Sequence, residues 1–144
     1  MEATSEATPL GDGPPISGLV PMISVAEVER SAAFYRLLGF EIGNYMPRSG
    51  AMYWAWLHAP KADNWKRGPN LMVTRRERPA ATNRQDVLFY LYAADLKSLR
   101  SALLATGVEA SEITYPEYLP NGEFRVHDPD GYTLMIAQSA ADTP

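Results

Sequence analysis

Apolar and polar residues alternate in short blocks along the chain, and their spacing switches between that of a strand and that of a helix. The run LVPMISV, which starts at Leu19, is short, apolar and rich in strand formers. The segment EVERSAAFYRLLGF that follows has its apolar residues at helical intervals, and Gly39 suits the left-handed position that ends a helix. The pattern predicts a strand and then a helix, followed by three strands in FEIGNYM, AMYWAWLHA and NLMVTRR.

The second half of the chain repeats this order. VLFYLYA has the composition of a strand, and DLKSLRSALLATG places leucines along one stripe of a helix, with Asp95 to cap its start and Gly107 its end. Sliding the chain on itself puts Glu27 on Asp95 and Gly39 on Gly107. EITYPEY, EFRVHD and YTLMIAQ are three further strand candidates. Both halves therefore indicate a βαβββ module.

The organisation that follows from this repeat has five segments. Residues 1–17 lack periodicity and are expected to form a tail that is disordered or exchanged between subunits. We expect a first module over 18–74 and a second over 86–138, joined by a basic, proline-bearing linker over 75–85. Residues 139–144 would form a C-terminal tail.

Composition narrows the classes of function. The 144 residues carry a net charge of −4, which argues against a general nucleic-acid partner. The absence of cysteine excludes a disulfide framework, a thiolate nucleophile, an iron–sulfur cluster and Cys-ligated zinc. The pattern contains neither a secretory signal nor a run long enough to span a membrane, so we expect no membrane partner and a cytoplasmic location.

Three stretches resemble a known family. VPMISVAEVERSAAFYRLLGFEIG, ADLKSLRSALLATGVE and FRVHDPDGYTLMIAQ, in this order, are similar to the glyoxalase / bleomycin-resistance / dioxygenase group, the vicinal-oxygen-chelate superfamily. The likeness runs from about Val20 to Gln138 and is closest in pattern to the metal-free, bleomycin-resistance-like members. It implies an α+β fold in which two tandem βαβββ modules form a curled mixed sheet, a cup, with the helices on the convex face.

The resemblance also identifies the positions at which metal-using members carry their ligands. One position lies near the start of each module's first strand and one on each module's last strand. These positions hold Val20, Met72, Leu88 and Met135. None of these side chains ligates a hard divalent cation, although methionine thioethers suit copper(I). We therefore expect neither a metal nor any other cofactor.

Strand alternation predicts which side chains line the cup. If Val20 and Leu88 point inward, residues two apart from them do so as well. The opposite face, with Ile23, Val25 and Leu134 among others, would meet the helices. Trp54 and Trp56 share one face, which is either the cup or the helix layer. The ligand-binding candidates are Met22, Ser24, Trp54, Trp56, Met72, Leu88, Tyr90, Tyr92, Arg125 and Met135.

Few residues suggest catalysis. Glu123 and Arg125 are two apart and share a face, so Arg125 could clamp an anion and Glu123 could act as a base, although a surface position is the simpler interpretation. The catalytic residues are thus unknown, with Glu123 and His127 as runners-up. The two histidines, His58 and His127, are expected to be exposed and unengaged. The turn Asp128–Gly131 is expected to serve the architecture only.

The leading hypothesis is a metal-independent protein that sequesters a hydrophobic or aromatic small molecule and performs no chemistry. The alternative is a lyase, isomerase or dioxygenase-type enzyme of the same superfamily. Pro21 matches a proline that drug-binding members carry where the N-terminal strand crosses to the partner subunit, so the resemblance also implies a homodimer with clefts at or near the interface.

Overall fold

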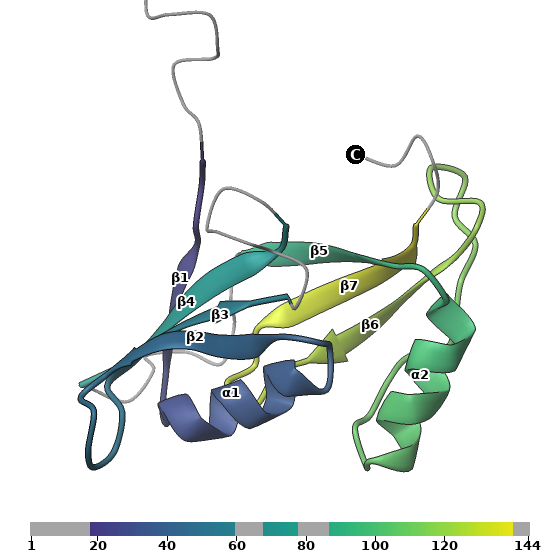
Figure 1. The fold of residues 1–144 in the computed structure, drawn as a ribbon. Coiled ribbons are helices and arrows are strands. Elements are labelled where there is room, and N and C mark those ends of the chain that lie inside the picture. The colour runs from purple at the N-terminus through teal and green to yellow at the C-terminus, as the bar shows by residue number, and fades with distance from the viewer. Residues whose placement is uncertain (1–17, 60–67, 78–86, 140–144) are drawn as a thin grey trace, which may run out of the picture.

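The computed structural model describes residues 18–59, 68–77 and 87–139, so the expected N-terminal tail, most of the linker and most of the C-terminal tail lie outside the described residues. The elements follow the predicted order (Figure 1). They are β1 (Met22–Val25), α1 (Val28–Arg36), β2 (Glu41–Met46), β3 (Trp54–His58), β4 (Asn70–Arg75), β5 (Leu88–Ala93), α2 (Leu96–Ala105), β6 (Glu123–His127) and β7 (Thr133–Gln138).

Each half of the chain forms its own mixed sheet. The first sheet has the strand order β1-β4-β3-β2, and the second has the order β5-β7-β6. In both, the strand before the helix pairs in parallel with the last strand of its half, and the other pairs are antiparallel. The α+β class with two helices is confirmed. The two sheets are separate and do not close on each other, and β1 and β5 are edge strands.

The strand expected over 112–118 does not form in the structure. Only a single bridge, between Thr114 and Glu123, forms there. Pro116 has no backbone N–H to donate, and its carbonyl instead accepts a hydrogen bond from the N–H of Leu119 at 2.9 Å, which turns the chain. The prediction of a full strand was therefore wrong, and the segment runs as a loop over one end of the second sheet.

Both helices begin and end much as the sequence predicts. Asp95 caps α2 by accepting a hydrogen bond from the backbone N–H of Ser98 at 3.1 Å, and this bond is the main reason that the pKa of Asp95 is lowered. Gly39 and Gly107 follow the two helices with φ of +96° and +90°, a conformation that a residue with a Cβ adopts only with strain. No helix among the described residues is long and apolar enough to cross a membrane.

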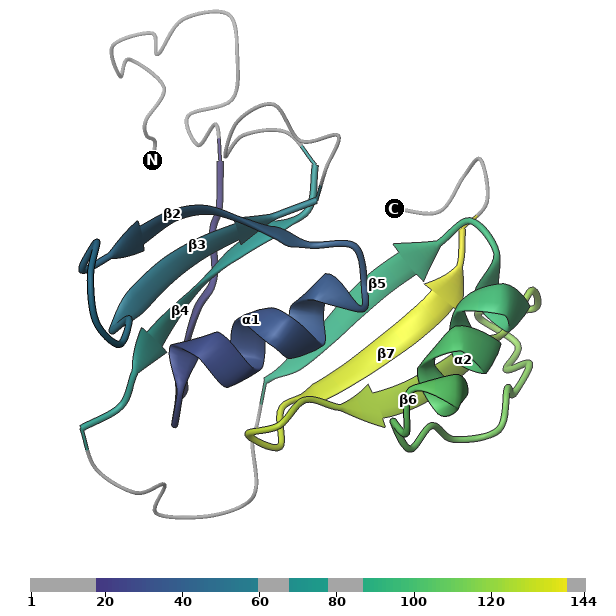
Figure 2. The ribbon, with the colours of Figure 1, turned by 60° about the horizontal axis from the view of Figure 1, so that its bottom comes forward.

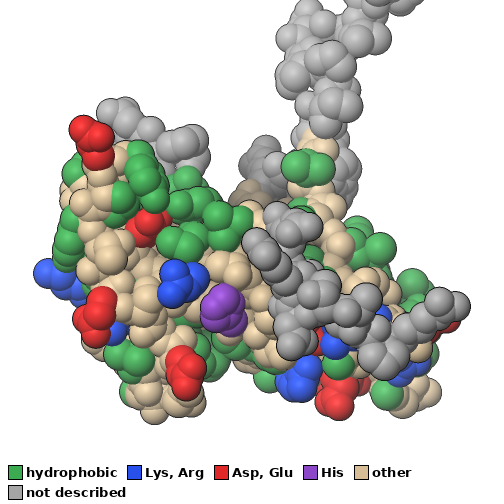
Figure 3. Space-filling model, turned by 180° about the vertical axis from the view of Figure 1, so that it is seen from behind, with side chains coloured by type: hydrophobic (Ala, Val, Ile, Leu, Met, Phe, Trp, Pro, Cys, Tyr) green, Lys and Arg blue, Asp and Glu red, His purple; other side chains and the backbone are tan. Residues whose placement is uncertain are grey.

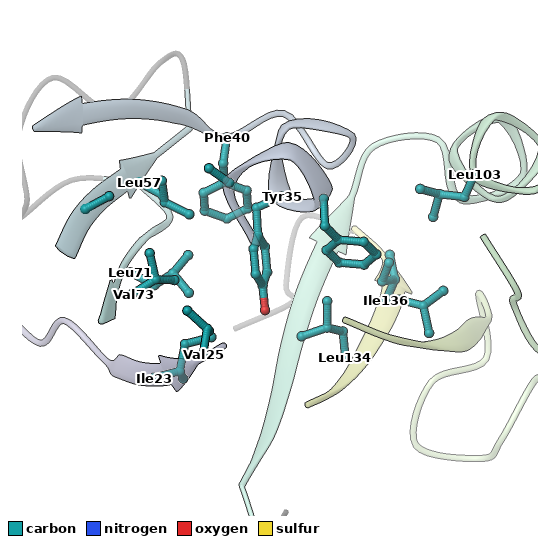
Figure 4. Packing of buried hydrophobic residues seen from close by; sticks show 14 of the residues in the cluster. Ile23, Val25, Tyr35, Phe40, Leu57, Leu71, Val73, Leu103, Leu134 and Ile136 are labelled. Carbon is teal, nitrogen blue, oxygen red and sulfur yellow. The ribbon is translucent and has the colours of Figure 1, made fainter. Parts of the chain in front are cut away.

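The core lies between the two sheets and the two helices, with α1 packed on the first sheet and α2 on the second (Figures 2 and 4). Ile23 and Val25 from β1 are buried, as are Leu134 and Ile136 from β7, so the predicted helix-side faces are confirmed. Tyr35 of α1 points between the two groups and donates a hydrogen bond to Asp128 Oδ2 at 2.8 Å. Helix α1 thereby joins the first sheet to the second half of the chain.

Candidate functional site

The face of the first sheet that points away from α1 carries the two tryptophans. Ala55 and Leu57 of β3 are buried in the core, so Trp54 and Trp56 lie on the opposite, open face. The register places Trp56 beside Met72, which lies beside Met22 on the edge strand. The structure thus resolves the alternative that the sequence left open.

Trp56 is held in place from three sides. Its indole N–H donates to Asn70 Oδ1 at 3.0 Å. Its ring stacks on His58 with centroids 4.7 Å apart and planes 10° from parallel, so His58 is engaged, against the sequence-based expectation. Gly43 on β2 lies directly under the indole, where a Cβ would come within 2.4 Å of the ring. Trp56 therefore forms a flat, rigid aromatic surface.

An open pocket of about 420 Å³ lies over this surface. Its lining within the described residues is Val20, Asn44, Trp54, Trp56 and Met72. Trp54, Trp56 and Met72 were ligand-binding candidates, whereas Asn44 and the supporting Gly43, Asn70 and His58 were not. A glycine inside a strand is a signal for close approach of another group, and it was available in FEIGNYM.

The second sheet has an open face of its own, and it is rich in tyrosine. Tyr90 lies beside Met135, which lies beside Arg125, and Tyr92 and Glu123 lie on either side of Ala137. Leu88, Tyr90 and Tyr92 are all exposed. Seen from behind, hydrophobic side chains gather over the half of the molecule that carries β5, β6 and β7 (Figure 3). The remaining second-half candidates therefore share one face.

Glu123 is the most unusual residue of this face, because its side chain is only 4% exposed. Its carboxylate accepts hydrogen bonds from the hydroxyl of Tyr90 at 3.0 Å and from that of Tyr118 at 3.1 Å. Burial, together with the bond to Glu123, raises the pKa of Tyr90 to about 12, so Tyr90 remains a proton donor in this pair. Glu123 is not the surface residue that the sequence suggested.

Arg125 and His127 lie further along β6 on the same side and are exposed. The backbone N–H of Arg125 bonds to Ser111 Oγ at 2.8 Å, while His127 Nδ1 lies 3.3 Å from Thr133 Oγ1. Neither contact joins His127 to Glu123. The structure thus aligns the two runners-up for catalysis on one strand without bringing them together as a pair.

The positions that the resemblance assigns to metal ligands fall on both sheets. Val20 and Met72 line the pocket of the first sheet, whereas Leu88 and Met135 lie on the second. Alkyl groups do not ligate metals, and methionine thioethers are poor ligands for hard divalent cations, so these residues do not fit a resident divalent cation. Within the described residues, no three histidines or carboxylates gather at one point either.

The turn at Asp128–Gly131 joins the two halves. Asp130 Oδ1 accepts a hydrogen bond from the backbone N–H of Ala26 at 2.8 Å and lies 3.3 Å from Arg30 and 3.2 Å from Arg76. Burial raises the pKa of Asp128, whose Oδ2 accepts from Tyr35, while the hydrogen bonds it accepts act in the opposite direction. This turn is architectural, as expected, and it positions the start of α1 against the second sheet.

Residues 19–136 match the model of the family described as the Glyoxalase/Bleomycin resistance protein/Dioxygenase superfamily. No curated protein matches the chain in sequence.

Several solved structures share the fold. A bleomycin-binding protein complexed with bleomycin is 19% identical, with a TM-score of 0.63 over 87% of this chain and 100% of that one. TnmS3, an antibiotic binding protein from Streptomyces sp. CB03234, is 17% identical, with a TM-score of 0.60 over 85% and 96%. An integron cassette protein from the mobile metagenome of the Halifax Harbour sewage outfall is 23% identical, with a TM-score of 0.66 over 86% and 100%. At these identities the likeness shows the fold alone.

Proposed function

The chain belongs to the glyoxalase/bleomycin resistance protein/dioxygenase superfamily, and from this premise we propose that it is a metal-independent binding protein that holds an aromatic or hydrophobic small molecule. The observation that carries the proposal is the pinned indole of Trp56 at the floor of an open pocket of about 420 Å³. Pockets for small organic ligands typically measure about 300–1,000 Å³ and are mostly apolar. A rigid aromatic floor binds a planar molecule with little loss of side-chain entropy.

Two of the structural neighbours support a binding role. One is described as a bleomycin-binding protein and another as an antibiotic binding protein. Binding through the burial of apolar surface also agrees with the residues at the four positions where metal-using members carry their ligands. These positions hold Val20, Met72, Leu88 and Met135, which offer apolar contact instead of metal ligation. The enzyme alternative has no comparable support, since Glu123 and His127 form no pair.

The complete site in this proposal is shared between two copies of the chain. Among the described residues, none from the second half lines the pocket of the first sheet, and the tyrosine-rich face of the second sheet is exposed. In a homodimer, the open face of the first sheet of one protomer would face the open face of the second sheet of its partner. Trp54 and Trp56 would then contribute one wall of the cup, and Tyr90 and Tyr92 the other.

Titration calorimetry with 2-naphthylmethanol, a neutral planar probe, tests the proposal. We expect saturable binding, accompanied by a change in tryptophan emission. Trp56→Ala should weaken it about tenfold, which corresponds to about 1.4 kcal/mol, because the stacking surface is removed.

Tyr53→Ala is the matched control, since Tyr53 is an exposed aromatic residue beside β3 that does not line the pocket. It should leave the affinity unchanged. Equal loss in both variants, or no binding by the wild-type protein, would contradict the proposal.

A further inference from the structure

The carboxylate of Glu123 is buried and has no cationic partner among the residues that the structure describes. Its two hydrogen-bond donors, the hydroxyls of Tyr90 and Tyr118, are neutral. The ion pairs within the described residues use Asp130 and Glu112, and none uses Glu123. A carboxylate removed from water is costly unless an opposite charge accompanies it, and two hydroxyl donors compensate only part of that cost.

The nearest positive side chain on the same face does not supply that charge. Arg125 is two residues from Glu123 on β6, yet its guanidinium is exposed and forms no ion pair with the carboxylate. His127, two residues further along, contacts Thr133 instead. The negative charge of Glu123 is therefore uncompensated by the described chain.

Aromatic rings lie beside Glu123 on the same face of the sheet. The rings of Tyr90 and Tyr92 lie 6.4 Å apart with planes 25° from parallel, and each tyrosine is about 40% exposed. Ala137 lies between Tyr92 and Glu123 in the register and is fully buried, so these residues share one face of the sheet. The π-faces of tyrosine rings attract cations, and amines are bound in proteins by such combinations of ring and carboxylate.

Tyr118 covers the carboxylate from the solvent side and is itself 69% exposed. It lies on the turn that follows Pro116 and has no sheet partner to hold it. Rotation of this one side chain would open Glu123 Oε2, while Tyr90 keeps its bond to Oε1. The subsite thus has a fixed donor on one oxygen and a displaceable donor on the other.

Resting on the function proposed above, we propose that the ligand of this protein carries an amine cation, and that Glu123, Tyr90, Tyr92 and Tyr118 form the subsite that receives it. The aromatic body of the ligand lies against the tryptophan wall of the cup, and its ammonium group replaces the hydroxyl of Tyr118 on Glu123. The class of ligand is therefore an aromatic or hydrophobic amine rather than a neutral or acidic compound.

Three matched probes test this assignment by calorimetry at neutral pH: 2-naphthylmethylamine as the cation, 2-naphthylmethanol as its neutral counterpart and 2-naphthylacetate as the anion. We expect the wild-type protein to bind the amine at least tenfold more tightly than the alcohol, and the acetate least tightly. Glu123→Gln should reduce the ratio of amine to alcohol affinity to near one.

Two further variants keep the test decisive if Glu123→Gln does not fold. Tyr118→Phe removes the displaceable hydroxyl but keeps the negative charge, so the preference for the amine should rise severalfold. Arg125→Gln removes the neighbouring positive charge and should maintain or raise that preference. A fall in the amine-to-alcohol ratio in Tyr118→Phe would overturn the proposal.

The outcomes separate this inference from the proposed function. If the wild-type protein binds the alcohol and the amine equally, the cation subsite is wrong and the binding function stands. If it binds none of the three probes, both proposals are wrong. If the amine preference is present but survives in Glu123→Gln, the cation binds elsewhere and the assignment to Glu123 is overturned.

Discussion

Trp56 shows how single residues determine the character of the candidate site. Its indole is fixed by Asn70 and His58 on the open side and has Gly43 beneath it. The strand pattern placed Trp54 and Trp56 on one face but did not say which face. That choice depends on the pairing of β3 with its two neighbours, which a local pattern does not contain.

Gly43→Ala should displace the indole of Trp56. A Cβ at this position would lie 2.4 Å and 2.5 Å from two ring carbons of Trp56 and 2.8 Å from His58, distances that real contacts do not reach. We expect a shift in the tryptophan emission maximum and about a tenfold loss of affinity for 2-naphthylmethanol, since the flat floor of the pocket is lost.

Gly50→Ala is the control for this substitution. Gly50 has a φ of +84°, so alanine there is strained, but nothing lies within 4 Å of the added Cβ. The variant should lower the unfolding free energy by about 1–2 kcal/mol and leave the emission maximum unchanged. If both variants change the emission equally, Gly43 does not act through contact with Trp56.

Asp130 acts at the scale of elements, because it ties the second half of the chain to the start of α1. Its buried carboxylate accepts hydrogen bonds from the backbone N–H of Ala26 and the hydroxyl of Ser31, and it forms ion pairs with two arginines. A negative charge beside the first turn of a helix also interacts favourably with the helix dipole. The sequence identified the DPDG turn but not its partners, most of which lie about a hundred residues earlier in the chain.

Asp130→Asn should destabilise the protein by about 1–3 kcal/mol, since it leaves two arginines without their shared carboxylate while preserving the shape of the turn. The arginine side chains are 47% and 25% exposed, so solvent screening keeps the loss below that of a fully buried pair. Urea denaturation followed by circular dichroism measures the difference in the free energy of unfolding.

Glu112→Gln makes the same chemical change in an exposed ion pair. Glu112 is 91% exposed and lies 3.5 Å from Arg100. We expect a change of no more than about 0.5 kcal/mol. Equal effects of the two substitutions would show that Asp130 contributes no more than a surface charge.

At the scale of the whole molecule, the two open faces explain the proposed assembly. Leu19, Met22 and Leu88 are 86%, 57% and 52% exposed, and all three lie on or beside the edge strands β1 and β5. Edge strands with apolar side chains favour pairing with another chain. We therefore expect a homodimer at micromolar concentration, with twice the chain mass of 15.9 kDa in light scattering.

Leu88→Lys should shift this dimer toward monomer by placing a charge on the exposed face beside the β5 edge. Leu104→Lys is the control, because Leu104 is 43% exposed but lies on α2, away from both edges. It should leave the mass unchanged. A wild-type protein that is monomeric at micromolar concentration would contradict the shared site, although it would leave the pocket of the first sheet intact.

The pattern of residues along the chain was enough to predict the order of the elements, their helix-side faces and the apolar character of the positions that the resemblance assigns to metal ligands. These properties depend on periods of two and 3.6 residues, on caps and on residue types, all of which are local. The same pattern predicted a full strand over 112–118. Pro116 has no N–H to donate there, and only one bridge to β6 forms.

Three features required the three-dimensional fold: the open face of β3, the burial of Glu123 beside Tyr90 and Tyr118, and the contact of Asp130 with the start of α1. Each of these depends on contact between residues far apart in the chain, or on a loop whose path the local pattern does not specify. The free energy of such contacts comes from burial and pairing in three dimensions, and no local periodicity encodes it.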